Sequence, residues 1–571
     1  MISIKQSKEN SSFLRSLDSQ GLNADPARGE APSPHRKPGK LLIALILLFL
    51  FCNLPGAALA QGQPVDGGSI VFGSIGDATS LIPRITSDTA SSDVQRYLYN
   101  GLVKYDKDLK LVGDLAESWE ISPDGLSITF HLKKGVKFHD GHEYTSKDAM
   151  FSYEFMVDPK TPTPYAGDYL KVKKAEAPDP YTFKVTYGEV FAPGLASWGM
   201  PQLPSHLLKG KDIRESPLNR NPIGTGPYRF DSWQQGSRIT LKVFKDYFEG
   251  RAHLDKITFR VIPDMATLFL ELRAGGIDQM GLTALQYQRQ TNNAFFKKNF
   301  NKFKYLASSY VYLAYNLKDS KFKDVRVRRA LTHAINKKEI IKGVLLGMGQ
   351  PAVSPYKPGT YWYNPNVSKY KYNPKKALQL LAEAGWKDTD NDGILDKNGQ
   401  PFEFTIITNQ GNPYRANSGI IIQQRLAAIG IKVQIRVIEW ASFIKEFIDK
   451  GRFEATILAW TITPDPDLYD VWHSENAKPG GLNFVSYKCP ELDELLTRGR
   501  LTFDQAERKA IYDKAQEILA RDQPYTFLYD TYALPIVNSR FYNIHPEPAG
   551  ISYNFIRWFV PKDRQGVKLL P

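Results

Sequence analysis

The chain has 571 residues, of which 42% are hydrophobic and 23% are charged, the composition of a folded globular protein rather than of a disordered chain. At roughly 150 residues per domain, this length allows two to four domains. The formal charge is +14, but short basic runs such as residues 326–329 fall inside helical patterns and form no stripe of the kind that binds nucleic acid. We therefore expect no nucleic-acid partner.

Residues 1–60 have the layout of a secretory signal. A polar segment ends in the basic stretch 35–40, the apolar run 41–51 follows, and Ala58-Leu59-Ala60 provides a small-x-small cleavage site. This apolar run is too short to cross a bilayer, which takes about 20 residues. We expect cleavage after Ala60 and export of the rest of the chain.

The two cysteines exclude a disulfide framework. Cys52 lies in the signal segment behind Phe49, Leu50 and Phe51, which are too bulky for the small residue that lipoprotein cleavage requires, so no lipid anchor is expected. After cleavage only Cys489 remains, and it has no partner for an intrachain disulfide.

From Gly68 to about Tyr305 the sequence predicts mostly strands and turns, with helices between them. Thr145 and Asp148 form a capping box at the start of one helix, and Asp264 precedes another that stops at Gly275. The strands predicted from alternating apolar residues are 126–138, 181–187 and 256–262.

From about Val311 to Asp530 the pattern changes to alternating helices and strands. Residues 402–408, 431–437 and 453–459 each predict a strand. One helix ending at Gly430 and another through Phe443 and Phe447 separate these strands. This β-α-β-α-β order predicts parallel strands with right-handed crossovers.

Ligands of open α/β sheets bind beyond the carboxyl ends of the strands. Here those ends deliver residues 409–413, then Glu439-Trp440, then residues 460–463. Two indoles, an amide and hydroxyls at one edge predict a polar site with aromatic surfaces. The alternative is that both tryptophans only cover the end of the sheet.

Six segments of the chain carry a resemblance to a known family: 98–141, 221–230, 314–341, 372–386, 459–475 and 480–496. They resemble the family 5 extracellular solute-binding proteins of peptide- and nickel-type ABC importers. The resemblance extends in order over essentially all of residues 68–560.

The resemblance implies an α/β fold, the periplasmic-binding-protein type II clamshell, with two lobes joined by a two-segment hinge. Closure traps a solute between the lobes, and the closed form docks on an inner-membrane ABC permease, so a periplasmic monomer without a cofactor or enzymatic activity is expected. The implied parts are lobe I at 61–308 with an extra subdomain at about 103–207, lobe II at 309–530, and a return to lobe I at 531–571.

The resemblance also implies which residues face the ligand. Lobe I contributes the segment 87–89, lobe II contributes most of the rest, and one tyrosine lies where the chain crosses back. The candidate ligand-binding residues are Ser87, Asp88, Thr89, Asn409, Trp440, Trp460, Thr461, Ile462, Thr463, Asp465, Asn483 and Tyr529.

One departure from the family pattern bears on the ligand. In peptide-binding relatives a carboxylate three residues after this tryptophan holds the free α-ammonium of the peptide, and here Thr463 has that position. A hydroxyl cannot balance a desolvated ammonium. Either Asp465 or Asp467 supplies the charge, or the ligand has no free amine there. The expected ligand is a peptide, and the alternatives are an oligosaccharide, a metal chelate or another amine-free solute.

Two acidic segments invite a metal interpretation. In residues 388–399 a glycine at the sixth place resembles the start of a calcium loop, but Gly399 stands where a bidentate Glu is needed, so a solvated turn is expected. The carboxylates that calcium would use are Asp388, Asp390, Asp392 and Asp396. Residues 138–143 contain two histidines but no H-E-x-x-H motif, so we expect a turn and no metal there.

Two other classes of protein remain as alternatives. An exported hydrolase would need a catalytic motif, and the sequence has no G-x-S-x-G, H-E-x-x-H or glycine-rich phosphate loop. A chemosensory receptor would have the same fold and would differ only in its partner.

Overall fold

The computed structural model describes residues 63–566, apart from the side chain of Arg214. The predicted signal segment and its cleavage site lie outside these residues, and the described residues belong to one compact unit. Within the described residues no helix has the length and apolar character needed to cross a membrane.

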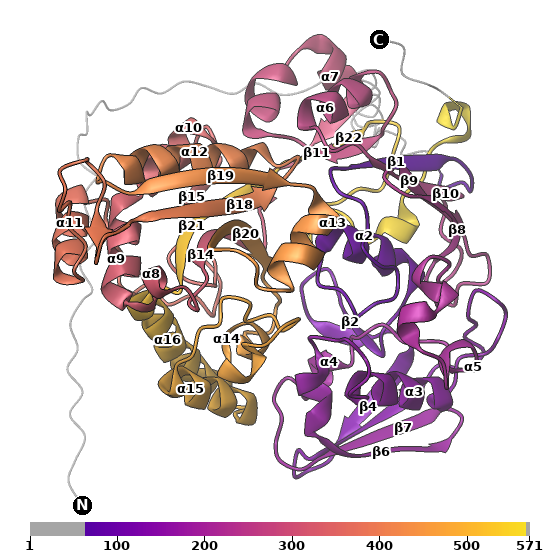
Figure 1. The fold of residues 1–571 in the computed structure, drawn as a ribbon. Helices are drawn as coiled ribbons and strands as arrows, with labels where there is room; N and C mark the ends of the chain where they lie inside the picture. Colours follow the sequence, from indigo (N-terminus) through magenta and orange to yellow (C-terminus); the bar gives the residue numbers. More distant parts are fainter. Residues whose placement is uncertain (1–62, 567–571) are drawn as a thin grey trace, which may run out of the picture. The chain divides into compact units, whose positions relative to one another are not determined.

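One mixed sheet of seven strands organises the first part of the described chain (Figure 1). Its central strand β1 pairs in parallel with β10 and β11, and β10 pairs antiparallel with β9. In sheet order the strands are β12 (Phe300–Lys302), β22 (Pro535–Asn538), β11 (Gln279–Gly281), β1 (Ser69–Ser74), β10 (Lys256–Val261), β9 (Arg238–Val243) and β8 (Tyr228–Gln234). We call this sheet and its helices the first lobe; those helices are α2 (Thr89–Leu98), α6 (Met265–Arg273) and α7 (Ala294–Asn299).

A four-stranded antiparallel sheet with its own helices lies between β1 and β8 in the sequence (Figure 1). Helix α3 begins at the predicted capping box of Thr145 and Asp148 and packs on this sheet. The strands in sheet order are β4 (Ala116–Ile121), β5 (Ser127–Leu132), β7 (Thr182–Tyr187) and β6 (Val172–Asp179), and the helices are α3 (Ser146–Val157), α4 (Gly194–Ser197) and α5 (Ser205–Leu208). The hairpin β2 (Val103–Tyr105) and β3 (Leu111–Gly113) precedes it.

A second large sheet organises residues 305–533 and defines the second lobe. Strand β18 pairs in parallel with both β19 and β20, which confirms the predicted β-α-β-α-β unit. In sheet order the strands are β13 (Tyr305–Leu306), β21 (Tyr525–Ala533), β14 (Ser309–Tyr315), β20 (Ala455–Thr461), β18 (Glu403–Asn409) and β19 (Lys432–Ile438), and β15 (Gly349–Pro351) pairs with β21. The small hairpin β16 (Asp396–Lys397) and β17 (Gln400–Pro401) stands apart.

Helices cover both faces of the second sheet, so its strands are apolar on both sides. Along β14, Tyr310 and Tyr312 face one core cluster, while Val311 and Leu313 face the other. The covering helices are α8 (Ser320–Lys323), α9 (Val325–Ala334), α10 (Lys337–Gly343), α11 (Pro374–Glu383), α12 (Pro413–Ala427), α13 (Trp440–Ser442), α14 (Tyr469–Trp472), α15 (Pro490–Leu501) and α16 (Gln505–Asp522).

The chain passes between the two large sheets twice, at adjacent places. The first passage joins β12 to β13, and the second joins β21 to β22. The paired segments of the second sheet at this point are β13 and the end of β21, where Leu306 is opposite Tyr532. Strand β22 then completes the first sheet, so a segment near the C-terminus stabilises the first lobe.

Two predicted elements differ from the structure. The strand expected over 126–138 ends at Leu132, because a turn follows in which Gly135 has a positive φ of 72°. The helix expected through Phe443 and Phe447 is the single turn α13 followed by a π-helical segment, Phe443–Ile448. π-Helical segments are short insertions and leave no separate signature in the hydrophobic pattern.

Candidate functional site

The carboxyl ends of β18, β19 and β20 lie at one edge of the second sheet, as their parallel pairing requires. Asn409 ends β18, Trp440 begins α13 just after β19, and Trp460 and Thr461 end β20. Both indoles are half-buried and Thr461 is exposed. The predicted convergence of polar and aromatic residues at this edge is therefore observed.

Trp440 connects this edge to the first lobe. Its Nε1 donates to Asp88 Oδ1 at 3.4 Å, and helices α13 and α2 lie side by side (Figure 1). A Cβ added to Gly76 would lie 3.1 Å from the indole, so the glycine leaves room for the ring. Lys445 makes a second contact between the lobes, from its Nζ to the carbonyl of Thr79 at 3.2 Å.

Asp88 is already saturated with donors from its own lobe. It caps α2 by accepting from Ser91 N at 2.9 Å, and it also accepts from the hydroxyls of Thr79, Thr86 and Ser91. Its neighbours in the predicted site differ, because Ser87 is half-buried and Thr89 is exposed. Of this segment, Asp88 positions the helix and the contact with Trp440, while Ser87 and Thr89 keep accessible hydroxyls.

Trp460 is held within the second lobe. Its Nε1 donates to the hydroxyl of Tyr525 at 3.2 Å, and its ring lies 5.9 Å from that of Phe484. Trp460 is paired with Tyr310 in the ladder between β20 and β14. This fixes the indole next to Thr461 and Ile462, at the start of the loop that follows β20.

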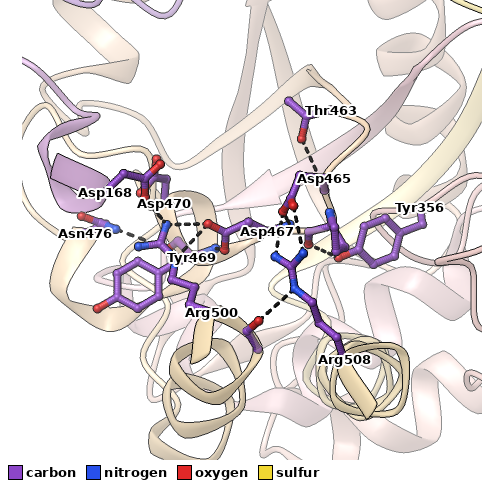
Figure 2. A network of polar contacts seen from close by, with 12 residues as sticks. Asp168, Tyr356, Thr463, Asp465, Asp467, Tyr469, Asp470, Asn476, Arg500 and Arg508 are labelled. Carbon is purple, nitrogen blue, oxygen red and sulfur yellow. Dashed lines mark hydrogen bonds and ion pairs between the residues drawn. The ribbon is translucent and has the colours of Figure 1, made fainter. Parts of the chain in front are cut away.

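The loop after β20 uses both of its candidate carboxylates internally (Figure 2). Asp465 accepts two bonds from Arg508, each of 2.9 Å, and Asp467 accepts from Arg500 Nε at 2.8 Å. The exposed Thr463 donates its hydroxyl to the carbonyl of Asp465 at 2.9 Å. Neither carboxylate is free to receive an ammonium while these pairs persist.

Arg500 gathers three carboxylates around one buried guanidinium (Figure 2). Its side chain is 2% exposed, and Asp467, Asp470 and Asp168 all lie within 3.4 Å of Nη2. Asp168 belongs to the segment that precedes β6, so this ion pair joins the four-stranded sheet region to the second lobe. The ring of Tyr469 lies 3.8 Å from the guanidinium carbon.

Three carboxylates and one guanidinium leave an excess of negative charge in this cluster. Burial, together with repulsion from Asp168, raises the pKa of Asp470 to about 8. Burial also raises the pKa of Asp168 to about 6, although the attraction of Arg500 opposes this. At neutral pH the cluster therefore favours retaining a proton on Asp470.

Three predicted site residues lie in internal contacts. Asn409 accepts from Arg415 Nη1 at 2.7 Å, and Tyr529 is fully buried beside Ser418. Asn483 is fully buried, and its amide bonds the backbone of Trp472, His473 and Tyr487. These side chains shape the edge of the second sheet, and none of them presents an unused polar group there.

The acidic loop at 388–396, for which a solvated turn rather than a calcium site is expected, divides into two parts. Asp388, Asp390 and Asp392 cluster at the surface, and each accepts from a backbone N–H of the same loop. Asp396 instead accepts from the backbone and hydroxyl of Thr389. These hydrogen bonds all lie within the loop.

Residues 138–143 form the predicted turn. Gly141 N donates to Phe138 O at 2.9 Å, and the buried His139 bonds the backbone of Gly224 and Gly226. Asp140 bonds His206, whose ring stacks on that of His142. His206 comes from α5, a contact for which the sequence pattern carries no signal.

Sequence reasoning also missed Asp168, Arg415, Arg500 and Arg508. Arg500 and Arg508 lie on α15 and at the start of α16, where they read as ordinary charged residues on helices. The only available signal was the run of aspartates at 465–470, which requires counterions if it is buried. Nothing in the local pattern indicates which arginines provide them.

Comparisons with known proteins agree with this architecture. Residues 110–480 match the family described as bacterial extracellular solute-binding proteins, family 5 middle. The oligopeptide-binding protein AppA of Bacillus subtilis is 38% identical over 523 residues, which cover 89% of this chain and 94% of AppA. The dipeptide-binding protein of Escherichia coli is 28% identical over 518 residues, covering 86% of this chain and 92% of that protein.

Solved structures give the same result. The structure of AppA from Bacillus subtilis with a nonapeptide matches with a TM-score of 0.84 at 36% identity and covers 88% of this chain and all of AppA. The periplasmic binding protein DppA of Helicobacter pylori, in complex with the peptide STSA, matches with a TM-score of 0.78 at 32% identity, covering 88% of this chain and 99% of DppA. The two-lobed α/β chain thus belongs to the family 5 bacterial extracellular solute-binding proteins.

Proposed function

We propose that this protein is the substrate-binding component of an ABC importer and that it captures peptides between its two lobes. The observation that carries the proposal is the contact of Trp440, at the carboxyl edge of the second sheet, with Asp88 and Gly76 of the first lobe. That is the place where α/β sheets bind ligands. The relatives named for oligopeptides and dipeptides, and the neighbours solved with peptides, support a peptide as the ligand.

Binding requires only a change in the distance between the lobes. A ligand that touches both lobes favours the closed state by its differential contacts, and a permease that recognises this state receives a loaded protein. The residues that we propose as ligand contacts are those with accessible groups on either side: Ser87, Thr89, Trp440, Trp460, Thr461, Ile462 and Thr463. No covalent chemistry enters this function, and we propose that the protein is not an enzyme.

The loop after β20 bears on how a peptide would be recognised. Asp465 and Asp467 are paired with arginines, and the hydroxyl of Thr463 carries no charge. We infer that this loop does not bind the α-ammonium of the peptide. The same observation favours one alternative, a solute without a free amine, such as an oligosaccharide or a metal chelate.

Purification of residues 61–571 and mass spectrometry of the ligand that co-purifies with them test the proposal. A bound peptide, and micromolar or tighter binding of peptides by calorimetry, are the expected results. If the protein binds a sugar or a metal chelate and has no affinity for peptides, the assignment of a peptide ligand is wrong and the transport role stands. Turnover of the bound solute would overturn the non-enzymatic function.

We further propose that the protein works outside the cytoplasmic membrane, in the periplasm, after cleavage behind Ala60. The family is extracellular, and the segment 35–60 has the order of a signal peptide. N-terminal sequencing of the exported protein should begin at Gln61. A start at a lipid-modified Cys52 would instead show an anchored protein.

A further inference from the structure

Arg415 lies where the two lobes meet. It is in the first turn of α12, and three residues, 410–412, separate this helix from the end of β18. Gly411, in the connecting turn, has a φ of +82°, and a Cβ there would lie 2.6 Å from the carbonyl of Pro263 in the first lobe. The hydroxyl of Tyr414, next to Arg415, accepts from the backbone N–H of Ala284, also in the first lobe. The segment that holds Arg415 is therefore in contact with both lobes.

The guanidinium of Arg415 has almost no partners. Its one side-chain hydrogen bond within the described residues runs from Nη1 to Asn409 Oδ1 at 2.7 Å. Its Nε is buried and has no acceptor, and no ion pair reaches this side chain from residues 63–566. Burial lowers the pKa of Arg415, and the groups that oppose this are the hydroxyls of Tyr529 and Tyr312 rather than a carboxylate.

Three arginines that are more deeply buried than the half-buried Arg415 show how guanidinium groups are paired in this protein. Arg328 donates to three backbone carbonyls, those of Phe322, Lys323 and Asp522. Arg500 faces three carboxylates, and Arg508 forms a two-pronged pair with Asp465. A charge left without such partners is costly to bury. Arg415 differs from all three because its one acceptor among residues 63–566 is a neutral amide oxygen, which favours a partner from outside these residues.

We propose that Arg415 binds a carboxylate of the captured solute. The inference rests on the proposed function, because it takes a peptide between the lobes as the source of that carboxylate. A guanidinium presents planar, paired donors that match the geometry of a carboxylate.

The carboxylate has two sources in a peptide, the C-terminus and an acidic side chain. Peptides that lack one of the two carboxylates distinguish these sources. Calorimetry of the wild-type protein with a peptide that carries both groups gives a reference affinity, and the same peptide with a C-terminal amide, or with Glu replaced by Gln, removes one source at a time. Loss of one carboxylate should weaken binding at least tenfold, and loss of the other should change it less than threefold.

Two substitutions test the residue. In Arg415→Met, affinity for the carboxylate peptide should fall to that of the matching amide, while affinity for the amide stays unchanged. Arg415→Lys keeps the charge without the planar donors and should recover part of the loss. Equal binding of all peptides by the wild type, or equal losses for acid and amide peptides in Arg415→Met, would overturn the inference and leave peptide capture standing. Failure of the wild type to bind any of these peptides would overturn the proposed function and this inference with it.

The melting temperature of the ligand-free protein separates a ligand-binding role from a structural one. Removing an unmatched buried charge should leave the melting temperature of Arg415→Met unchanged or raise it. Arg328→Met is the matched control, because it leaves three carbonyls without a donor and should lower the melting temperature. If Arg415→Met is destabilised as strongly as the control, Arg415 is structural. If it fails to fold, Arg415→Lys takes its place in the comparison of acid and amide peptides, and equal losses for both peptides would overturn the inference.

Discussion

Asp465 and Arg508 form a two-pronged ion pair, in which Nη1 and Nη2 of the arginine each lie 2.9 Å from a different carboxylate oxygen. Both side chains are largely buried, with exposed fractions of 19% and 8%. The pair connects the loop after β20 to the start of α16 (Figure 2). A carboxylate in this geometry is part of the scaffold that supports the loop and is not a vacant ligand site.

We predict that Asp465→Asn lowers stability without removing peptide binding. Loss of the carboxylate leaves Arg508 buried without its counterion, which typically costs about 3–5 kcal/mol. Urea unfolding should therefore show a lower midpoint, while calorimetry should show affinities for free-amine peptides within about threefold of the wild type.

The double variant Asp465→Asn/Arg508→Gln is the control for this prediction. It removes the orphaned charge and should regain part of the lost stability. A drop of a hundredfold in affinity for free-amine peptides, with affinity for N-acetylated peptides unchanged, would instead identify Asp465 as the ammonium anchor.

The sequence predicted the parallel unit of the second lobe because its signals are local. Apolar residues recur along β18, β19 and β20, and Gly430 marks the end of the helix between the first two of these strands. Once the strands are parallel, the meeting of Asn409, Trp440 and Trp460 at one edge follows from geometry alone.

The ion pairs of the polar side chains near that edge could not be predicted in the same way. Asp168 and Arg500 meet through the packing of two regions that are remote in the chain, and no periodicity encodes such a pair. The role of Asp465 depends on whether an arginine reaches it, and this is set by how α15 packs against α16. The local sequence pattern thus indicates where a site lies. Whether each polar side chain at that site is free or already paired can be known only from the tertiary structure.

A second prediction concerns Trp440. Trp440→Ala removes the indole that fills the space beside Gly76 and contacts Asp88, so the closed state loses contacts that the open state does not make. We expect the affinity for peptide to fall about tenfold to a hundredfold, equivalent to about 1.4–2.8 kcal/mol, with a small change in melting temperature because the ring is half-buried.

Trp440→Phe separates packing from hydrogen bonding at this position. It keeps an aromatic ring of smaller area and loses the bond to Asp88, which is long at 3.4 Å, so affinity should fall much less than in Trp440→Ala. Wild-type affinity in Trp440→Ala would contradict the assignment of Trp440 to the contact between the lobes.

A third prediction concerns the pH dependence of ligand binding. In this structure Asp168 lies beside Asp467, Asp470 and Arg500, and burial together with repulsion from Asp168 raises the pKa of Asp470 to about 8. We predict that this cluster forms when the lobes close, so that the closed state takes up a proton. Affinity should therefore decrease as the pH rises from 6 to 9, by no more than about tenfold per pH unit for one proton. Calorimetry in buffers of different ionisation enthalpy should detect proton uptake at pH 7.5.

Asp470→Asn is the test of this assignment. The amide is neutral at every pH, so the variant should bind more tightly than the wild type at pH 9 and should show a flatter pH profile. An unchanged profile in Asp470→Asn would place the titrating group elsewhere.

A fourth prediction concerns Asp530, in β21 close to where the chain passes between the lobes. Its side chain is buried, Oδ1 has no hydrogen-bond partner, and Oδ2 accepts from Gln350 at 3.2 Å. Burial raises its pKa to about 7, against the opposing hydrogen bond from Gln350 and the charges of Lys357 and Lys337. The folded state therefore holds the proton more tightly than the unfolded state does.

The direction of the change in stability with pH follows from this difference between the folded and unfolded pKa of Asp530. A carboxyl whose pKa is raised on folding contributes its full stability below the ordinary pKa of 3.8 and loses it as the pH rises toward 7. Asp530→Asn removes this cost. At pH 8 its melting temperature should therefore exceed that of the wild type, and its free energy of unfolding should be higher by at least about 1 kcal/mol. At pH 4 the two proteins should differ little.

Asp522→Asn gives the matched control for this pH dependence. Burial opposes ionisation of Asp522, but hydrogen bonds from Arg521 and Tyr487 outweigh it and lower its pKa. Its contribution is therefore present at pH 8 and lost in acid, so this variant should be less stable than the wild type at pH 8. Because the two aspartates have opposite signs, scanning both variants from pH 4 to 9 distinguishes a specific buried carboxyl from a general effect of removing negative charge. A lower melting temperature for Asp530→Asn at pH 8 would mean that Asp530 is ionised and stabilised by Lys337 and Lys357.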